Sequence, residues 1–163
     1  MISKTIQDAL NAHIEEEMYS SNLYLAMAAY CESLNLKGFS NWMRIQSKEE
    51  LAHAIKFFDY LIDRGGRAEI KAVAAPSNQY KSPRDVFEKT LEHEKEVTEK
   101  INKIYELALK EKDYATQNFL QWFISEQVEE EARATEYAEK LKMIGEGSNA
   151  IWWVDKELRK RES

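Results

Sequence analysis

The chain has 163 residues and a formal net charge of −6, and it contains only five glycines and two prolines. This composition favours packed helices over sheet or disorder, and the acidic balance argues against nucleic-acid binding, because phosphate recognition needs clustered cations. The N-terminus leads directly into a polar amphipathic segment without the apolar run of a signal peptide or membrane span, so we expect a cytoplasmic protein that does not bind membranes.

Apolar residues recur at helical spacing in four long segments and one short segment, which we predict to be α-helices. Asn35 stands between the first two segments, and Gly65 follows the second, where a residue that tolerates the left-handed conformation is favoured. Ser82 and Pro83 supply an N-cap and a first-turn proline for the third. The predicted helices span residues 5–34, 37–64, 84–111, 114–144 and 149–159.

The connections between these segments predict the topology. The first two helices and the next two are joined by turns of a few residues, so each pair should be antiparallel. The segment between the second and third helices is too long for a hairpin, and at ~3.3 Å per residue it could run the whole length of a helix. We therefore predict one all-α domain over residues 1–163: a four-helix bundle of about residues 5–145 with one long crossover, followed by a short C-terminal helix near 148–159.

The inward-facing stripe of every long helix is interrupted by polar residues near its middle. On the first helix, for example, Glu17 follows Leu10 and Ile14 on the same apolar stripe. A lone glutamate and histidine three residues apart would ordinarily mark a solvated helix face, but here the interruption occurs on all four helices. The interrupting residues are Glu17, Glu50, His53, Glu94, Gln127 and Glu130.

The positions of the turns indicate that these interruptions meet. Glu17 and Glu50 lie at similar sequence distances from the turn near Asn35, so they should be level with each other in the hairpin. Glu94 and Gln127 are placed in the same way about the second turn. The same number of residues separates three pairs of these positions along the sequence, which suggests a pseudo-twofold repeat. The pairs are Glu17 and Glu94, Glu50 and Gln127, and His53 and Glu130.

Four glutamates in one buried layer require a positive partner, because each isolated carboxylate costs several kcal/mol to bury. No lysine or arginine occupies the inward stripes near the layer, and His53 alone is insufficient. Two divalent metal ions would balance the charge. Carboxylates with one imidazole suit iron or manganese, with zinc also possible, and the spacing of Glu50 and His53 is typical of di-iron carboxylate bundles.

With these residues placed, the chain resembles the non-haem ferritins of bacteria and archaea over nearly its whole length. The segments that carry the resemblance are residues 24–28, 38–42, 119–123 and 125–131. The resemblance implies that Glu17 and His53 bind one iron and that Glu94 and Glu130 bind the other. It also implies that Glu50 bridges the two irons and that Gln127 lies nearby without bridging.

Tyr24 lies two turns after Glu17 on the same helix face. A core tyrosine hydrogen-bonded to a carboxylate and a participant in the redox reaction are both compatible with this position, and we assign it the supporting role. The ferritin resemblance further implies a third iron site formed by Glu49, Glu126 and Glu129, with Glu130 shared. The alternative for these residues is an ordinary acidic face in contact with solvent.

The function implied by the resemblance is iron storage with ferroxidase activity: Fe(II) is oxidised by O2 and kept as ferric mineral inside a shell, which in ferritins has 24 subunits. Haem is not expected, because the methionine that binds haem in bacterioferritins would fall near Leu51 or Ala52. The iron entry route is left open, since Gln117 and Leu120 stand where many ferritins line a channel with acids. Two alternatives are a di-iron oxidase for an organic substrate and a structural subunit held by metal.

Three further features concern packing and assembly. Cys31 is a lone cysteine and should be a small buried residue rather than part of a disulfide. Trp42 and Trp122 are expected to be packing or interface residues. The segment 150–154 contains two adjacent tryptophans and carries more apolar surface than a short terminal helix should leave in water, so we expect it to pack against copies of itself.

Overall fold

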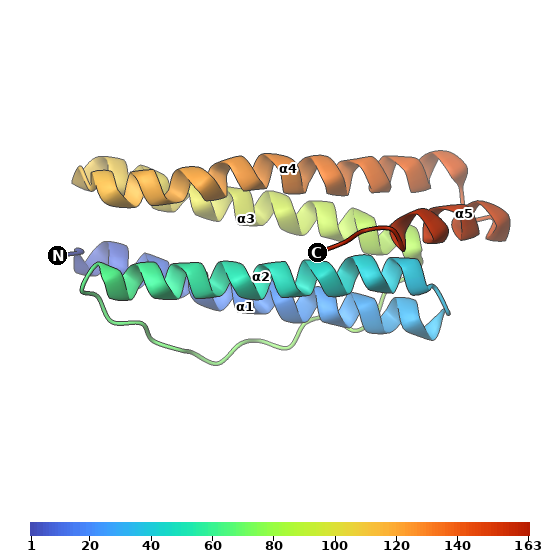
Figure 1. Cartoon of the computed structure of the whole chain (residues 1–163), viewed down its shortest axis with the longest axis horizontal. Helices are drawn as coiled ribbons and strands as arrows, with labels where there is room; N and C mark the ends of the chain where they lie inside the picture. Colours follow the sequence, from blue (N-terminus) through green and yellow to red (C-terminus); the bar gives the residue numbers. More distant parts are fainter.

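The computed structural model describes residues 1–163 and contains five α-helices and no strands (Figure 1). The all-α prediction is confirmed, and every helix begins and ends within one residue of its expected boundary. None of the five combines the length and the apolar character that crossing a bilayer requires. The helices are α1 (Lys4–Ser33), α2 (Lys37–Asp63), α3 (Pro83–Glu111), α4 (Tyr114–Ile144) and α5 (Ser148–Leu158).

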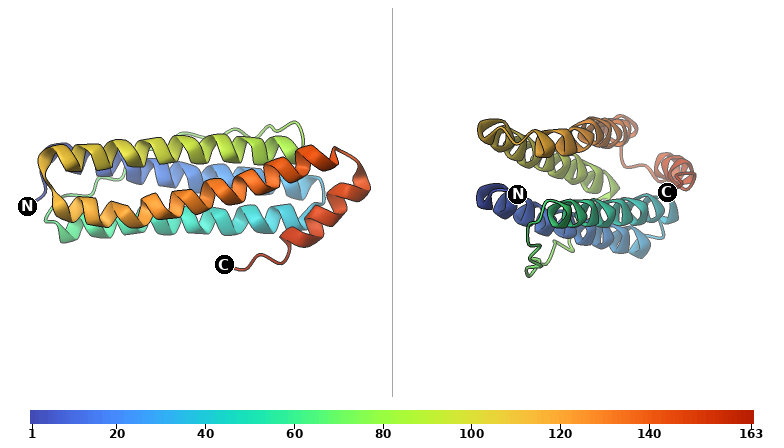
Figure 2. Two further views of the ribbon diagram at one scale, coloured as in Figure 1. Left: turned by 90° about the horizontal axis from the view of Figure 1, so that it is seen from above. Right: turned by 60° about the vertical axis from the view of Figure 1, so that its left-hand side comes forward.

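The four long helices form two antiparallel hairpins, α1–α2 and α3–α4, which lie against each other as two layers (Figure 2). Asn35 and Lys112 stand in the two hairpin turns with positive φ angles of 59° and 56°, the left-handed conformation that commonly ends a helix. The beginning of α3 is as predicted from the sequence: the N-cap Ser82 accepts a hydrogen bond from the Asp85 amide at 3.1 Å, and Pro83 is the first helical residue.

The crossover between α2 and α3 runs along the outside of the α1–α2 hairpin (Figure 1). The Asn11 side chain of α1 holds its first part, donating to the Arg67 carbonyl at 3.0 Å and accepting from the Glu69 amide at 2.8 Å. Near its end, the Tyr80 ring packs on Tyr30 with ring centroids 5.4 Å apart. The crossover therefore follows α1 for most of its length and returns the chain to the end of the bundle where α3 begins.

The apolar core is divided into two clusters. One surrounds Phe39, Trp42 and Phe87 at the end of the bundle that carries α5, and it includes the buried Cys31. The other surrounds Phe57 and residues from the beginning of α1 and α4 at the opposite end. Buried polar side chains fill the layer between the two clusters, at the level that the sequence pattern indicated.

The short helix α5 is fixed at one end of the bundle by a buried carboxylate. Asp155 accepts hydrogen bonds from the amides of Gly38 and Phe39 at 2.7 and 3.1 Å, and so it caps α2, whose own N-cap residue makes no side-chain bond. A Cβ added to Gly38 would lie 1.7 Å from the Asp155 carbonyl oxygen. Glycine is therefore required at this position for α5 to dock on α2.

Candidate metal centre

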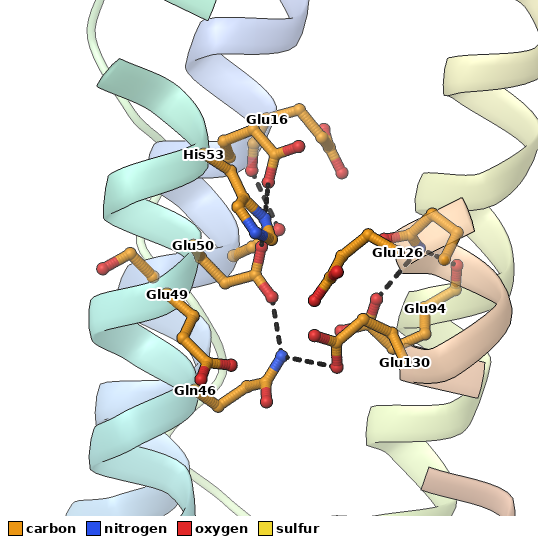
Figure 3. A network of polar contacts seen from close by, with 12 residues as sticks. Glu16, Gln46, Glu49, Glu50, His53, Glu94, Glu126 and Glu130 are labelled. Carbon is orange, nitrogen blue, oxygen red and sulfur yellow. Dashed lines mark hydrogen bonds and ion pairs between the residues drawn. The ribbon is translucent and has the colours of Figure 1, made fainter. Parts of the chain in front are cut away.

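Side chains from all four long helices meet in the middle of the bundle. Figure 3 shows Glu50 and His53 of α2 on one side, facing Glu94 and Glu130 on the other. Glu17 reaches the same layer from α1, and Gln127 reaches it from α4. Every one of these six residues is at most 5% exposed to solvent. The structure thus brings together all six residues that the interrupted stripes identified.

The half of the layer formed by α1 and α2 contains two carboxylates and an imidazole. The Nδ1 atom of His53 lies 3.1 Å from Oε2 of Glu50 and 3.9 Å from Oε2 of Glu17. One potential ligand atom from each of the three residues falls within 4.8 Å of the others, which is close enough to share a metal ion. The buried Oε2 atom of Glu17 has no hydrogen-bond partner, so this oxygen is free to bind a cation.

The half formed by α3 and α4 is organised around Glu94. Tyr24 donates a hydrogen bond to Oε1 of this carboxylate, and Gln127 donates to Oε2 at 3.1 Å. Gln127 also donates to the Thr98 hydroxyl at 3.2 Å. The facing carboxylate, Glu130, keeps its buried Oε1 atom without a hydrogen-bond partner. Tyr24 and Gln127 therefore each contact a potential ligand.

Gln46 joins the two halves, although no role was predicted for it from the sequence. Its amide donates to Oε1 of Glu50 at 2.8 Å and to Oε2 of Glu130 at 3.0 Å (Figure 3). Its own oxygen accepts from Arg161 at 2.9 Å, beyond the end of α5. Gln46 was visible as a polar residue one turn before Glu50 on the same stripe, but its contact with the chain terminus depends on how α5 folds back.

His13 is a second residue whose role the sequence did not show. It is 2% exposed, and its Nε2 atom lies 2.8 Å from Oε1 of Glu17. Burial lowers the pKa of His13 to about 4, so the ring is neutral near pH 7. An ionised Glu17 can only accept a hydrogen bond, so Nε2 must then carry the proton and donate it. The spacing of four residues before Glu17 was the only available signal for this contact.

Burial makes the layer unfavourable for negative charge when no cation is bound. Desolvation and then the charge of Glu50 raise the pKa of Glu130 to about 7, and desolvation also raises the pKa values of Glu17, Glu50 and Glu94. Desolvation alone would lower the pKa of His53, but its hydrogen bond to Glu50 and the surrounding negative charges raise it to about 9. A metal ion entering the layer would replace protons on these carboxylates.

The donor set fits iron. Four carboxylates and one imidazole are hard and borderline ligands of the kind that Fe(II) and Fe(III) accept, and the two unpartnered oxygens belong to opposite halves of the layer. Each half can therefore offer its own ion a buried oxygen that no protein group already uses. Glu50 lies between the halves, within reach of His53 on one side and linked through Gln46 to Glu130 on the other.

The residues expected to form a third iron site also lie together, but with a cation among them. The guanidinium group of Arg133 lies within 4.0 Å of all four carboxylates in this set. Arg133 lies outside the inward stripes and reaches the rim of the layer from the side of α4, so the stripe pattern did not identify it. The four carboxylates are those of Glu49, Glu126, Glu129 and Glu130.

Two of the other sequence-selected residues lie near the layer or near the bundle end. Trp122 is 43% exposed and stands edge-on to His53, with the Lys56 ammonium 3.2 Å from its ring centroid. Leu120 is fully buried in the apolar cluster around Phe57, so it cannot line an entry channel on the surface of α4.

Comparison with known proteins agrees with this architecture. A family model described as the ferritin-like domain matches residues 7–144. The bacterial non-heme ferritin of Staphylococcus aureus is 42% identical over 161 residues, covering 99% of this chain and 97% of the relative, and that of Staphylococcus haemolyticus is 41% identical over the same span. An open-pore ferritin from the archaeon Archaeoglobus fulgidus has a TM-score of 0.98 and 51% identity, with 99% of each chain covered.

A buried layer of carboxylates and histidine between two antiparallel helix hairpins defines a class of helical bundles suited to holding a pair of metal ions. The fold, the long crossover and the match with ferritins over nearly the whole chain identify the family within this class. The chain belongs to the ferritin family, and the resemblance drawn from its sequence motifs is confirmed.

Proposed function

We propose that this chain is an iron-storage subunit with ferroxidase activity. The observation that carries the proposal is the buried layer of four glutamates and His53, which has an unpartnered carboxylate oxygen in each half. Membership of the ferritin family supports iron as the substrate, and the curated relatives are named non-heme ferritins. The cytoplasmic location stays a prediction from the sequence.

In this proposal the two halves of the layer each take one Fe(II). Glu17 and His53 would hold the first ion, Glu94 and Glu130 the second, and Glu50 would bridge them. Two Fe(II) ions would each give up one electron to O2, which takes up two protons and leaves as hydrogen peroxide. The protein contributes the positions of the ions and the negative charge that favours the ferric state. Gln127 and Tyr24 would orient Glu94, and His13 would orient Glu17.

The ferric product would then be stored inside a homo-oligomeric shell. The exposed apolar surface of α5 supports self-association, since Trp152 and Trp153 are 54% and 63% exposed. We propose a shell of 24 subunits, as the ferritin family implies. In such an assembly the two tryptophans would be buried, so no exposed apolar surface would remain to promote further association.

An oxidase acting on an organic substrate would need a pocket that reaches the metal ions. None of the main surface hollows is lined by a carboxylate ligand of the layer, and one hollow, of about 460 Å³, touches Gln127 alone among the six layer residues. The aromatic rings of Phe57 and Phe123 close the layer on one side, with centroids 4.3 Å apart. These observations favour Fe(II) and O2 as the substrates.

Oxygen uptake tests the proposal. Protein loaded with Fe(II) under anaerobic conditions is mixed with oxygenated buffer in an oxygen electrode cell, and protein loaded with Zn(II) is the control. We expect rapid O2 consumption in proportion to the Fe(II) bound, and none with Zn(II). A merely structural metal site would bind both ions without consuming O2 faster than Fe(II) in buffer. An oxidase for an organic substrate would consume more O2 than the supplied Fe(II) can reduce, and it would do so only when that substrate is added.

A further inference from the structure

The clearest feature that iron storage does not explain is the position of Arg133. Its Nη2 atom lies 3.1 Å from Oε2 of Glu129 and 3.7 Å from Oε1 of Glu126. Its Nη1 atom lies 3.7 Å from Oε1 of Glu130 and 4.0 Å from Oε2 of Glu49. One guanidinium group thus faces all four carboxylates of the set that is expected to bind a third iron.

A metal ion at this set would need the same oxygens. Carboxylate oxygens bind divalent metals at about 2.0–2.6 Å, so an ion shared by these carboxylates would lie where the guanidinium group now lies. Glu130, which the buried layer and this set share, supports a cation site here, because its buried Oε1 atom has no hydrogen-bond partner and lies 3.7 Å from Nη1 of Arg133. Arg133 and a third metal ion therefore cannot occupy the set together.

The set is also held by a second arginine from the C-terminal segment. Arg161 donates to Oε2 of Glu49 at 2.8 Å and to Gln46 at 2.9 Å, and its guanidinium carbon lies 4.3 Å from the centroid of the Trp42 ring. Its side chain is 12% exposed, whereas that of Arg133 is 35% exposed. Arg161 is packed in place, but Arg133 can turn outward into solvent.

We propose that Arg133 is a tethered cation that competes with the third iron, and that a metal ion occupies this set only after the guanidinium group turns out to solvent. The inference rests on the proposed function, because it assigns a control to the third ion bound beside the pair. Arg133 would offset part of the negative charge of the set while iron is scarce. It would also make the third ion bind more weakly than the first two.

Zinc titration by isothermal calorimetry tests this inference without relying on oxidation. Wild-type protein should bind two Zn(II) per subunit tightly and a third more weakly. In Arg133→Gln, which removes the charge and keeps a similar shape, the third ion should bind about tenfold more tightly, since several ion pairs of the exposed kind no longer compete with it. Arg133→Lys, which keeps the charge, should remain close to wild type.

Two further variants locate the effect. Arg133→Gln combined with Glu129→Gln should lose the tightened third ion, because a ligand of the set is gone. Arg44→Ala removes an exposed arginine that pairs with Glu32 away from the site, and it should change none of the affinities. An equal affinity for the third ion in wild type and Arg133→Gln, or no third ion in either protein, would overturn the inference.

The same titration separates this inference from the proposed function. Loss of the first two tight equivalents in wild-type protein would contradict the buried di-iron layer, whatever happens to the third. The response of the third equivalent to Arg133→Gln reports only on competition at the outer set. Each conclusion can therefore fail while the other stands.

Discussion

The individual residues of the layer are arranged so that metal binding and proton binding compete. Glu130 shows this most clearly, because burial and the nearby charge of Glu50 raise its pKa from 4.5 to about 7. Near pH 7 this carboxyl is therefore about half protonated until a cation arrives. A ligand with an unpartnered oxygen and a raised pKa releases a proton on binding a metal, so metal affinity should weaken as the pH falls below 7.

The metal-free protein should show the same competition in its stability. Between pH 4.5 and about 7 the folded protein keeps a proton on Glu130 that the unfolded chain releases. The contribution of this carboxyl to the free energy of unfolding is therefore complete below pH 4.5 and declines as the pH rises to about 7, by on the order of 3 kcal/mol. Glu130→Gln has no proton to release and should lose this part of the pH dependence.

Urea unfolding of both metal-free proteins at several pH values between 4.5 and 8 measures the effect. Glu17, Glu50 and Glu94 also have raised pKa values, and the lowered pKa of His13 acts in the opposite direction, so the difference between the two proteins is the informative quantity. Parallel stability curves would show that Glu130 is ionised in the folded protein throughout this range.

At the scale of the helices, local sequence signals were sufficient to predict the boundaries but not every cap. Ser82 and Pro83 lie at the beginning of α3 itself, so the start of this helix could be predicted from the local sequence. The beginning of α2 is different, because its free amides are capped by Asp155, which follows them by more than a hundred residues. A cap from a distant element leaves no local pattern.

The positions of the metal-layer residues could be predicted because, like the helix boundaries, they follow from local sequence patterns. Helical periodicity defines which side chains point inward, and two short turns bring Glu17 level with Glu50 and Glu94 level with Gln127. The contacts of Arg133 and Arg161 could not be predicted in this way. Both side chains approach the layer from outside the apolar stripes, and their reach depends on rotamers and on the docking of α5.

Asp155→Ala should loosen α5 from the bundle. It leaves two buried amides at the beginning of α2 without an acceptor, and we expect a loss of about 1–2 kcal/mol in the free energy of unfolding. Thermal or urea unfolding of the metal-free protein measures it. Asp155→Asn keeps an acceptor oxygen and should retain most of the stability. Equal stability of Asp155→Ala and wild type would show that water replaces the cap without cost.

At the scale of the whole molecule, one subunit leaves apolar surface that an assembly would cover. Trp152 and Trp153 of α5 are exposed, and so is Met143 near the end of α4, which is 85% exposed. The number of subunits follows from neither periodicity nor the fold of one chain, because it depends on the angles between neighbouring copies. It is the part of the proposal that rests on family membership alone.

Replacing both tryptophans by glutamate should prevent formation of a complete shell. The charged side chains would repel one another if α5 packs against its own copies, while Asp155 and Arg161 would still hold α5 on α2. Light scattering should then show smaller assemblies than wild type, whereas Trp152→Phe with Trp153→Phe should assemble normally. Deleting the chain from Gly147 onward should also impair assembly and mineral loading. A full-size, fully loading shell from either the glutamate variant or the truncated chain would show that the α5 surface is dispensable.

The central claim is that the buried layer binds and oxidises a pair of Fe(II) ions, and stopped-flow absorbance of Fe(II) oxidation tests it most directly. Wild-type protein should oxidise two Fe(II) per subunit in a rapid first phase. Glu50→Ala should lose that phase while keeping its helical circular dichroism, because the bridging carboxylate is gone. Glu139→Ala, at an exposed position on α4, should behave as wild type. If Glu50→Ala oxidises two Fe(II) per subunit at the wild-type rate, the reaction does not take place in this layer.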